Sequence, residues 1–265
     1  MCQKRWDCET LFWLIWNERW NLFNEAGTAR AIEYCNCGGG ATGIEVAGIL
    51  SEMKKFVLPN DYPDMPSSLM HIYLIEAGPR LLAGMSEESS AHAEQFLREM
   101  GVNILLNKRV VDYRDHKVVL EDGTEIATRT FIWVSGVTGV TIGNLDASLI
   151  GRGGRIKVDS FNRVEGMNNV FAIGDQCIQV ADEDYPNGHP QLAQVAIQQG
   201  ELLAKNLVRM EKGREMKPFH YRNLGSMATV GRNRAVAEFS KVKMQGWFAL
   251  GDVAGCSSAF YPWSA

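Results

Sequence analysis

The chain has 265 residues, of which 46% are hydrophobic and 22% are charged, and its formal net charge is −4. This is the composition of a globular protein, and it excludes a disordered chain, a collagen-like repeat and a coiled coil. A slightly acidic chain without a basic block also argues against nucleic acid as the main partner. The length fits one large domain or two small ones.

The six cysteines show neither a Cys-x-x-Cys motif nor a regular spacing, so we expect free thiols in a reducing compartment rather than disulfides. The five histidines lack metal-ligand spacing, and no metal site is expected. The longest early apolar run, residues 11–16, is too short to span a bilayer, and no signal-peptide cleavage site follows it. These features predict a soluble, cytoplasmic protein.

The segment at residues 32–37 does not fit a buried central strand. Glu33 and Asn36 are polar, whereas a strand buried on both faces is normally a continuous apolar run. We therefore expect residues 1–37 to form an atypical head outside the native fold.

A glycine loop follows directly. Its pattern, with Gly38, Gly40 and Gly43, is typical of dinucleotide binding, because glycines permit a tight turn, a close approach of the backbone to a pyrophosphate and close helix packing. The loop opens an amphipathic stretch at residues 44–58, as this function requires. A purely structural glycine turn is the alternative.

A β-α-β order continues beyond the loop. Residues 71–76 form a β-branched and aromatic run that predicts a strand, and Ser86 is a suitable N-cap for a helix that stops at Gly101. Further strands are predicted at residues 103–106, 109–113, 117–121, 124–127 and 130–134, with Asp122-Gly123 as a hairpin turn. This order predicts a dinucleotide-binding sheet with a β-meander crossover.

Two carboxylates follow predicted strands. Glu76 closes the strand after the glycine loop, where a carboxylate binds ribose hydroxyls and disfavours a 2′-phosphate. Asp175 comes directly after Gly174 at the end of an apolar strand predicted at residues 170–173, and open α/β sheets bind ligands at such strand ends. For Gly174 and Asp175, a simple strand-end turn is an equal alternative.

A long helix is predicted at about residues 191–211, in a second unit that begins near Leu145. Gln194 and Gln198 are four residues apart and therefore share one face of this helix. The small side chain of Ala196 beside them would let a flat group approach. A solvated polar face is the alternative.

Together these segments resemble the C-terminal portion of a type II NADH:quinone oxidoreductase, a member of the FAD-dependent pyridine nucleotide-disulphide oxidoreductase superfamily. The matching segments are residues 38–45, 72–80, 131–137, 169–175, 193–200 and 225–232. The Ala-Gln-x-Ala-x-Gln and Gly-Ser-Met-Ala patterns among them are specific to this branch. The resemblance implies an α/β fold, in which a Rossmann-like NADH-binding domain is inserted in a partial FAD-binding domain that lacks its N-terminal third.

The resemblance also implies two domains and the roles of their residues. Residues 38–143 would form the NADH-binding domain, and residues 144–249 the C-terminal part of the FAD-binding domain with a quinone-side segment. Expected at NADH are Gly38, Gly40 and Gly43 at the pyrophosphate, Glu76 at the ribose, and Trp133 and Gly136 at the nicotinamide. Expected at FAD and quinone are Gly174 and Asp175 at the flavin cofactor, Gln194 and Gln198 near the flavin ring and quinone, and Glu45 as a proton-handling carboxylate.

The implied cofactors are FAD and NAD, and the implied activity is hydride transfer from NADH to FAD and then of two electrons to a membrane quinone. The family attaches peripherally to the cytoplasmic face of the inner membrane, and a homodimer is expected. Its membrane-docking segment is not recognised in the atypical tail at residues 250–265. We hypothesise that both ends, near residues 37 and 250, are read in a shifted frame, because a one-base shift yields family-like residues there.

Two other functions remain open at this point. One is a non-catalytic NAD-binding remnant, because half of the expected flavin contacts are missing. The other is a different FAD-dependent reductase, such as a ferredoxin reductase, which the Ala-Gln-x-Ala-x-Gln pattern disfavours and an acceptor assay would separate.

Overall fold

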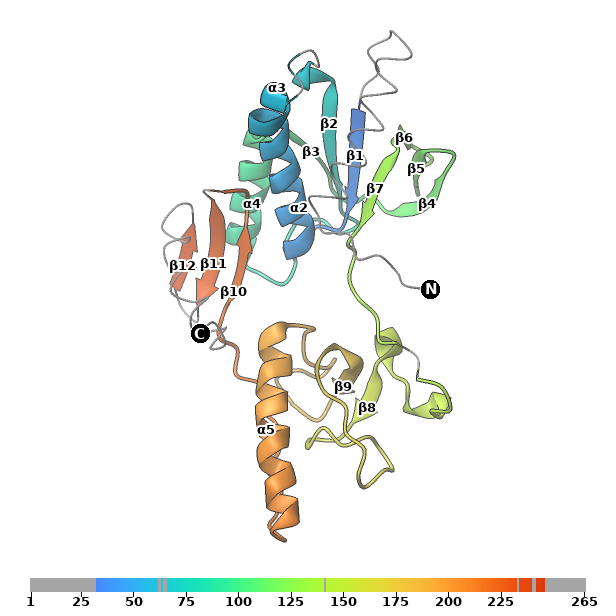
Figure 1. The fold of residues 1–265 in the computed structure, drawn as a ribbon, viewed down its shortest axis with the longest axis vertical. Coiled ribbons are helices and arrows are strands. Elements are labelled where there is room, and N and C mark those ends of the chain that lie inside the picture. The colour runs from blue at the N-terminus through green and yellow to red at the C-terminus, as the bar shows by residue number, and fades with distance from the viewer. Residues whose placement is uncertain are drawn as a thin grey trace. The chain divides into compact units, whose positions relative to one another are not determined.

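The computed structural model describes residues 32–61, 63, 66–140, 142–232, 234–239 and 242–245. Within these residues the chain forms two compact units (Figure 1). The first contains the described residues up to Ser135 together with Ser226–Glu238 and residues 242–245, and the second contains Gly136–Gly225 and Phe239. Our expectations for residues 1–31 and 250–265 fall outside the described part of the chain.

The first unit is built on a four-stranded parallel sheet. Its strands, in spatial order, are β3 (Val102–Leu105), β2 (Met70–Ile75), β1 (Ile32–Cys37) and β7 (Thr130–Trp133). Cys37 is paired with Ile75 on one side and with Trp133 on the other, so the carboxyl ends of three strands meet at one edge. This is the edge at which parallel α/β sheets bind ligands.

The central strand of this sheet is β1, although its polar residues argued against a strand. Tyr34 and Cys35 are both buried, on opposite faces of the sheet. The side chain of Asn36 is also buried, and its Nδ2 donates a hydrogen bond to Gly43 O at 2.6 Å. The strand tolerates this polar side chain because the first turn of the following helix supplies a partner.

Two helices, α2 (Ala41–Glu52) and α4 (Glu87–Glu99), lie on one face of the sheet (Figure 1). A π-helical turn at Met53–Val57 and the short helix α3 (Leu58–Asp61) extend α2. The single helix predicted at residues 44–58 is therefore present, but it changes its helical type in its last turns.

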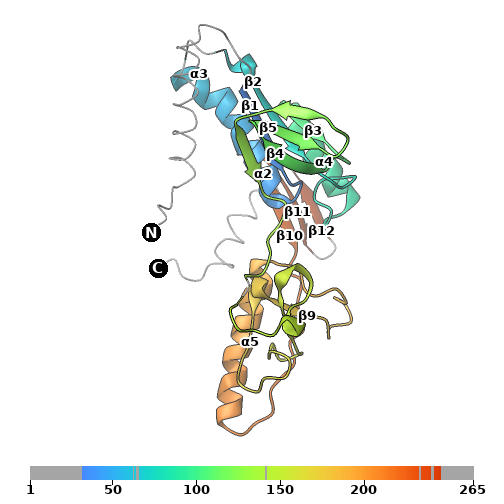
Figure 2. The same ribbon diagram turned by 90° about the vertical axis from the view of Figure 1, so that its right-hand side faces the viewer.

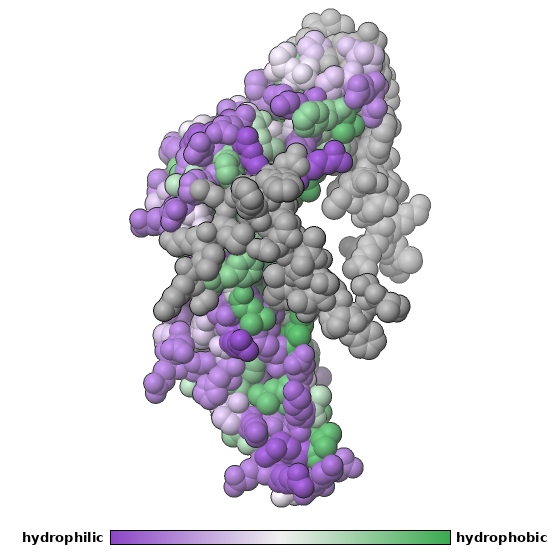
Figure 3. Space-filling view, turned by 90° about the vertical axis from the view of Figure 1, so that its left-hand side faces the viewer, coloured by the Kyte–Doolittle hydropathy of each residue, from purple (hydrophilic) through white to green (hydrophobic). Residues whose placement is uncertain are grey.

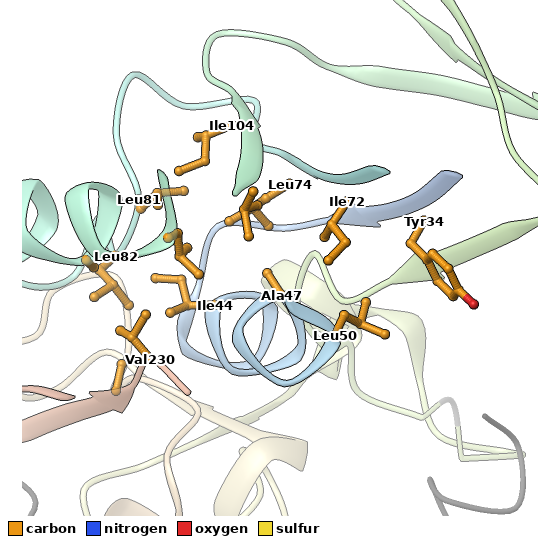
Figure 4. Packing of buried hydrophobic residues seen from close by; sticks show 14 of the residues in the cluster. Tyr34, Ile44, Ala47, Leu50, Ile72, Leu74, Leu81, Leu82, Ile104 and Val230 are labelled. Atoms are coloured by element: carbon orange, nitrogen blue, oxygen red, sulfur yellow. The ribbon is translucent and has the colours of Figure 1, made fainter. Parts of the chain in front are cut away.

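The main core lies between α2 and the sheet. Ile44, Ala47 and Leu50 recur on one side of α2, and they pack with Ile72 and Leu74 of β2 (Figure 4). All five side chains are at most 5% exposed. Burial of one leucine or isoleucine side chain contributes about 1.5–3 kcal/mol to folding. This packing therefore fixes the position of α2, and with it the position of the loop that precedes the helix.

The other face of the sheet carries an antiparallel meander of β4 (Val110–Arg114), β5 (Lys117–Leu120) and β6 (Glu125–Ala127) (Figure 2). Val118 and Leu120 of β5 are buried in one cluster with Cys35. The hairpin turn predicted at Asp122-Gly123 is present, since Gly123 has φ +83° and donates from its N to Leu120 O at 2.9 Å.

A further sheet of the first unit comprises β10 (Ser226–Thr229), β11 (Ala235–Phe239) and β12 (Val242–Gln245). Val230, in the turn after β10, joins the core of α2. Gly48 of α2 faces this turn so closely that a Cβ at residue 48 would lie 2.6 Å from Gly231 N. Glu52, one helical turn further, accepts a hydrogen bond from Arg232 N at 2.5 Å. Helix α2 is therefore held between the parallel sheet and a segment far away in the sequence.

The second unit contains a parallel strand pair, β8 (Ile156–Val158) and β9 (Cys177–Gln179), and the long helix α5 (Ala193–Glu211), which confirms the predicted helix. The strand predicted at residues 170–173 is wrong. Phe171 forms only an isolated bridge with Arg163, and Ala172 N donates to Asn162 O at 3.0 Å. The backbone of this segment is hydrogen-bonded to a nearby turn instead of to a neighbouring strand.

Helix α5 exposes apolar side chains as well as charged ones. Ile197, Leu207 and Val208 are 46%, 47% and 48% exposed. The surface of this unit accordingly shows hydrophobic residues among hydrophilic ones (Figure 3). No helix within the described residues is long and apolar enough to cross a membrane.

Candidate functional site

The glycine loop connects β1 to α2 at the carboxyl edge of the parallel sheet. Gly38 has φ +125°, and a Cβ there would lie 2.6 Å from Val134 O. A Cβ at Gly43 would lie 1.7 Å from Gly38 O, which no side chain tolerates. The first glycine is thus required by the neighbouring backbone at Val134, and the third by the close packing of the loop itself. A Cβ at Gly40 would meet no described atom within 4 Å, so the backbone at the second glycine is open to a ligand.

Helix α2 begins directly after this open glycine. Gly40 is the N-cap residue, no side chain caps the helix, and its first turn contains no acidic residue. Ala41 and Thr42, the first two helical residues, are exposed. The unpaired N–H groups and the helix dipole therefore give this end a partial positive charge that favours an anion.

Glu76 follows β2 at the same edge and lies beside the loop. Its Oε2 accepts a hydrogen bond from Gly39 N at 2.5 Å, and its Oε1 accepts one from Gly78 N at 2.6 Å. Each carboxylate oxygen has a second lone pair that a hydroxyl group can use. The structure thus brings Glu76 next to the glycine loop, although the two are far apart in the sequence.

The loop after Glu76 is organised by Arg80, whose importance the sequence did not reveal. Its guanidinium donates to the carbonyl oxygens of Ala83 and Met85 at 2.8 Å each, and to Leu82 O at 3.3 Å. Leu82 in turn donates from its N to Gly39 O at 2.8 Å. The only sequence signal for Arg80 was its place at the end of a family-like segment, since backbone acceptors leave no pattern of residue types.

Trp133 ends β7 next to the glycine loop. It is 58% exposed and packs edge to face against Phe131, with ring centroids 5.9 Å apart. Val134 N donates to Cys37 O at 2.9 Å, which ties this strand end to the start of the loop. Gly136 is the first residue of the second unit and has φ +111°, a conformation that favours glycine.

Glu45 lies on the side of α2 that faces β10. Its Oε1 accepts a hydrogen bond from Thr229 Oγ1 at 3.1 Å. The side chain is partly buried, and Thr229 N also lies 3.5 Å from the same oxygen. The carboxylate is therefore held by a neighbour from β10 rather than pointing freely into solvent.

In the second unit, Gly174 and Asp175 form a turn directly before β9. Gly174 has φ +66° and donates from its N to Gln199 Oε1 at 2.7 Å. A Cβ at Gly174 would lie 3.2 Å from the Cβ of Ala196, so α5 packs tightly against this turn. The side chain of Asp175 remains exposed. Gln199, which is 1% exposed, thus fixes the turn that presents Asp175, and sequence reasoning missed it.

Gln194 and Gln198 lie on one face of α5, as their spacing predicts. Both side-chain amides form hydrogen bonds with the backbone of residues 222–225. Both amides on this helix face therefore bond protein backbone. They are not simply solvated, and any contact with a ligand would come in addition to these bonds.

The described cysteines have buried, neutral thiols. Burial, reinforced by the charge of Glu33, raises the pKa of the Cys35 thiol to about 12. Burial also raises the pKa of Cys37 and of Cys177. Because the thiolate is the reactive form, these residues act as small apolar side chains and not as nucleophiles. No group of metal-binding side chains occurs in the part of the chain that the structure describes.

Comparison with known proteins gives a family match over most of the chain. Residues 24–200 match the family described as pyridine nucleotide-disulphide oxidoreductase. The chain is 33% identical to the type II NADH:quinone oxidoreductase NdhA of Mycobacterium tuberculosis, over 85% of this chain and 49% of that protein. It is 30% identical to the type II NADH:quinone oxidoreductase of Haemophilus influenzae, over 80% and 49% of the two chains. The chain thus spans about half the length of these curated relatives.

Solved structures agree on the fold. NDH2 from Plasmodium falciparum, in complex with NADH, superimposes with a TM-score of 0.75 at 19% identity and covers 85% of this chain and 62% of that chain. A ferredoxin reductase from Rhodopseudomonas palustris gives a TM-score of 0.57 at 17% identity, over 81% and 56%. The α/β fold class and the family resemblance expected from the sequence are confirmed.

Proposed function

Because this chain belongs to the pyridine nucleotide-disulphide oxidoreductase family, we propose that it carries the NADH-binding part and a portion of the flavin side of a type II NADH:quinone oxidoreductase. The names of its relatives support this reaction over others of the family. In this proposal, residues 38–143 bind NADH, and residues 144–249 contribute to the flavin and quinone side.

The observation that carries the proposal is the arrangement of the glycine loop, α2 and Glu76 at one sheet edge. The open backbone at Gly40 and the uncapped N–H groups of α2 fit a pyrophosphate. Glu76 lies beside Gly39, where its carboxylate accepts ribose hydroxyls. Its negative charge repels a 2′-phosphate, which favours NADH over NADPH.

The flavin side rests on the turn at Gly174 and Asp175. The exposed carboxylate of Asp175 fits hydroxyl groups of the FAD ribitol, and Gly174 lets the turn pack on α5. When bound, FAD supplies a redox centre that accepts a hydride from NADH and passes electrons to the acceptor. In this proposal Trp133 and Gly136 lie at the nicotinamide, and Glu45 is a proton-handling carboxylate.

The proposed acceptor is a quinone, on the side of α5 that carries Gln194 and Gln198. The names of the relatives support the quinone, whereas peripheral attachment to the cytoplasmic face of a membrane and a homodimer rest on the family resemblance alone. Sedimentation of the purified chain with lipid vesicles tests the attachment, and its equilibrium mass tests the dimer.

The decisive experiment is a calorimetric titration of the purified chain with NADH and with NADPH. We expect saturable NADH binding at one site per chain and weaker NADPH binding. No heat of binding with NADH would refute the proposal. Turnover with NADH, added FAD and a water-soluble quinone then tests the complete reaction.

Two other functions have observations in their favour. The superposition on a ferredoxin reductase supports a different acceptor, and comparison of quinone with ferredoxin as acceptor in the same assay separates the two. A non-catalytic NAD-binding remnant would use the same glycine loop and Glu76. A remnant would bind NADH but retain no flavin absorbance after gel filtration with FAD.

A further inference from the structure

The second unit begins with a largely exposed connector, residues 137–140, which directly follows Gly136. Val137 and Val140 are 59% and 73% exposed, and the connector contains neither helix nor strand. A segment that buries so little apolar surface opens easily unless other interactions hold it. Its conformation therefore depends on the groups that bind its backbone.

The backbone of Val140 is bound by the side-chain amide of Gln176. Val140 N donates to Gln176 Oε1 at 2.9 Å, and Gln176 Nε2 donates to Val140 O at 2.6 Å. A primary amide offers a donor and an acceptor, as a peptide group does, so Gln176 pairs with Val140 in the way that a neighbouring strand would. One side chain thus provides partners for both backbone polar groups of an exposed residue.

The preceding residue of the connector is held by backbone packing. Gly139 N donates to Gly153 O at 2.8 Å, and a Cβ at residue 139 would lie 2.3 Å from Gly154 O. The next residue along, Arg155, donates from Nε to Cys177 O at 2.6 Å. The turn at residues 153–155 therefore attaches the connector to the first residue of β9.

Gln176 also ends the turn that presents Asp175, since this turn spans Gly174–Gln176. Gly174, at its start, is bound to Gln199 of α5, whereas Gln176, at its end, is bound to the connector. The exposed Asp175 thus lies between two anchored residues. Because Gln176 follows Asp175 directly, a change in the conformation of this turn also moves the amide that holds Val140.

We propose that Gln176 is a positioning residue whose amide fastens the connector to the turn of Asp175, so that FAD bound at this turn also orders residues 139–140. The fastening stands on the hydrogen bonds of Gln176 alone, whereas the part played by FAD rests on the proposed function. A ligand that binds only the ordered turn stabilises the segments attached to that turn. Gln176 therefore acts through the connector and not by contact with the flavin.

Amide hydrogen exchange of the purified, ¹⁵N-labelled chain tests the fastening. Gln176→Met removes the amide but keeps the length of the side chain, and we expect roughly tenfold faster exchange at Val140 N, as the loss of one hydrogen bond allows. Gln176→Asn keeps an amide that is one methylene shorter, and we expect the same acceleration. Gln191→Met is the matched control, because the amide of Gln191 donates to Asp175 O on the turn itself, at 3.2 Å. Exchange at Val140 N should stay unchanged in this control.

The same measurement with added FAD tests the coupling. FAD should slow exchange at Val140 N in the unaltered chain and in Gln191→Met, but in neither variant of Gln176. Unchanged exchange at Val140 N in both Gln176 variants would overturn the fastening, and FAD that binds the unaltered chain without slowing Val140 N would overturn the coupling. If a titration followed by flavin fluorescence shows no FAD binding to the unaltered chain, the flavin side of the proposed function fails together with the coupling. Exchange at Val140 N without FAD would then still decide whether Gln176 fastens the connector.

Discussion

The three glycines of the loop differ in the space that surrounds their Cα atoms. Gly38 and Gly43 stand where a Cβ would overlap the main chain, whereas a Cβ at Gly40 would meet no atom of the described residues. The fold requires the first and third glycines, whereas in the proposed function the second is required for ligand approach. Stability and dinucleotide affinity are measured independently, so these two requirements can be separated by substitution.

We expect Gly43→Ala to lower the free energy of unfolding by about 3 kcal/mol, because the added methyl overlaps Gly38 O. Gly40→Ala is the matched variant. Residue 40 has φ −74°, which alanine adopts without strain, so we expect the free energy of unfolding of this variant to change by less than about 0.5 kcal/mol. We expect it to bind NADH more weakly, because the methyl group stands where the ligand approaches. Urea denaturation and NADH titration of both variants provide the measurements. Equal destabilisation by the two substitutions would contradict this division.

Glu76 should control the choice between the two nicotinamide dinucleotides. In Glu76→Gln the negative charge beside Gly39 is lost, and we expect the ratio of the NADPH Kd to the NADH Kd to fall by roughly tenfold or more. Calorimetric titration with both nucleotides measures the ratio. Glu121→Gln, an exposed carboxylate on the meander side, serves as a control for net charge. A ratio that stays constant in Glu76→Gln would exclude the ribose role.

A buried pair makes the second unit sensitive to acid. His189 Nε2 lies 3.0 Å from Asp182 Oδ2, and this hydrogen bond lowers the pKa of Asp182 below its ordinary value of 3.8. The pKa of Asp182 is lower in the folded than in the unfolded chain, so its ionised form stabilises the fold. This stabilisation is complete when the pH is above 3.8, and it disappears as the pH falls through the pKa of the folded state. Below about pH 4, the free energy of unfolding of the unaltered chain should fall as the pH falls. We expect this fall to be smaller for Asp182→Asn. Denaturant titrations across this pH range, with the exposed Asp184→Asn as control, give the comparison.

Among the helices and strands, those with local signals were predictable. Ser86 was predicted as the N-cap of α4, and its Oγ accepts from Ser89 N at 3.3 Å. The central strand β1 was not predictable, since the partner of Asn36 lies on another element. The strand predicted at residues 170–173 failed for a related reason, because an apolar run becomes a strand only where a neighbour pairs with it.

The cap of α4 also depends on β11. Glu238 Oε1 accepts hydrogen bonds from Ser86 N at 2.9 Å and from Ser89 Oγ at 2.6 Å. We expect Ser86→Ala to cost about 1 kcal/mol of unfolding free energy, because α4 loses its cap and Glu238 loses one of its donors. Urea denaturation measures the change. Ser148→Ala, a serine-to-alanine change in the second unit, is the comparison. If it lowers the unfolding free energy more than Ser86→Ala does, the result argues against a stabilising cap at Ser86.

Across the whole molecule, residues with a chemical role were easier to predict from the sequence than the residues that hold them in place. The glycine loop follows a known spacing, Glu76 was recognised by its place at the end of the next strand, and the structure brings them together. Arg80 and Gln199 bind backbone atoms, which any sequence supplies, so no pattern of residues marks them. The same reason explains why the bonds of Gln194 to the backbone of residues 224 and 225 were not foreseen, whereas its expected place near a ligand stays a prediction.

Helix α2 connects ligand binding to strands that come much later in the chain. Its N-terminus is the proposed anion site, and its flank contacts the turn after β10 through Gly48 and Glu52. A ligand that binds only the folded helix raises the free energy needed to open everything packed on it. NADH should therefore slow proteolysis and amide exchange within Ser226–Glu238, a segment of the same unit that lies far from the glycine loop in the sequence.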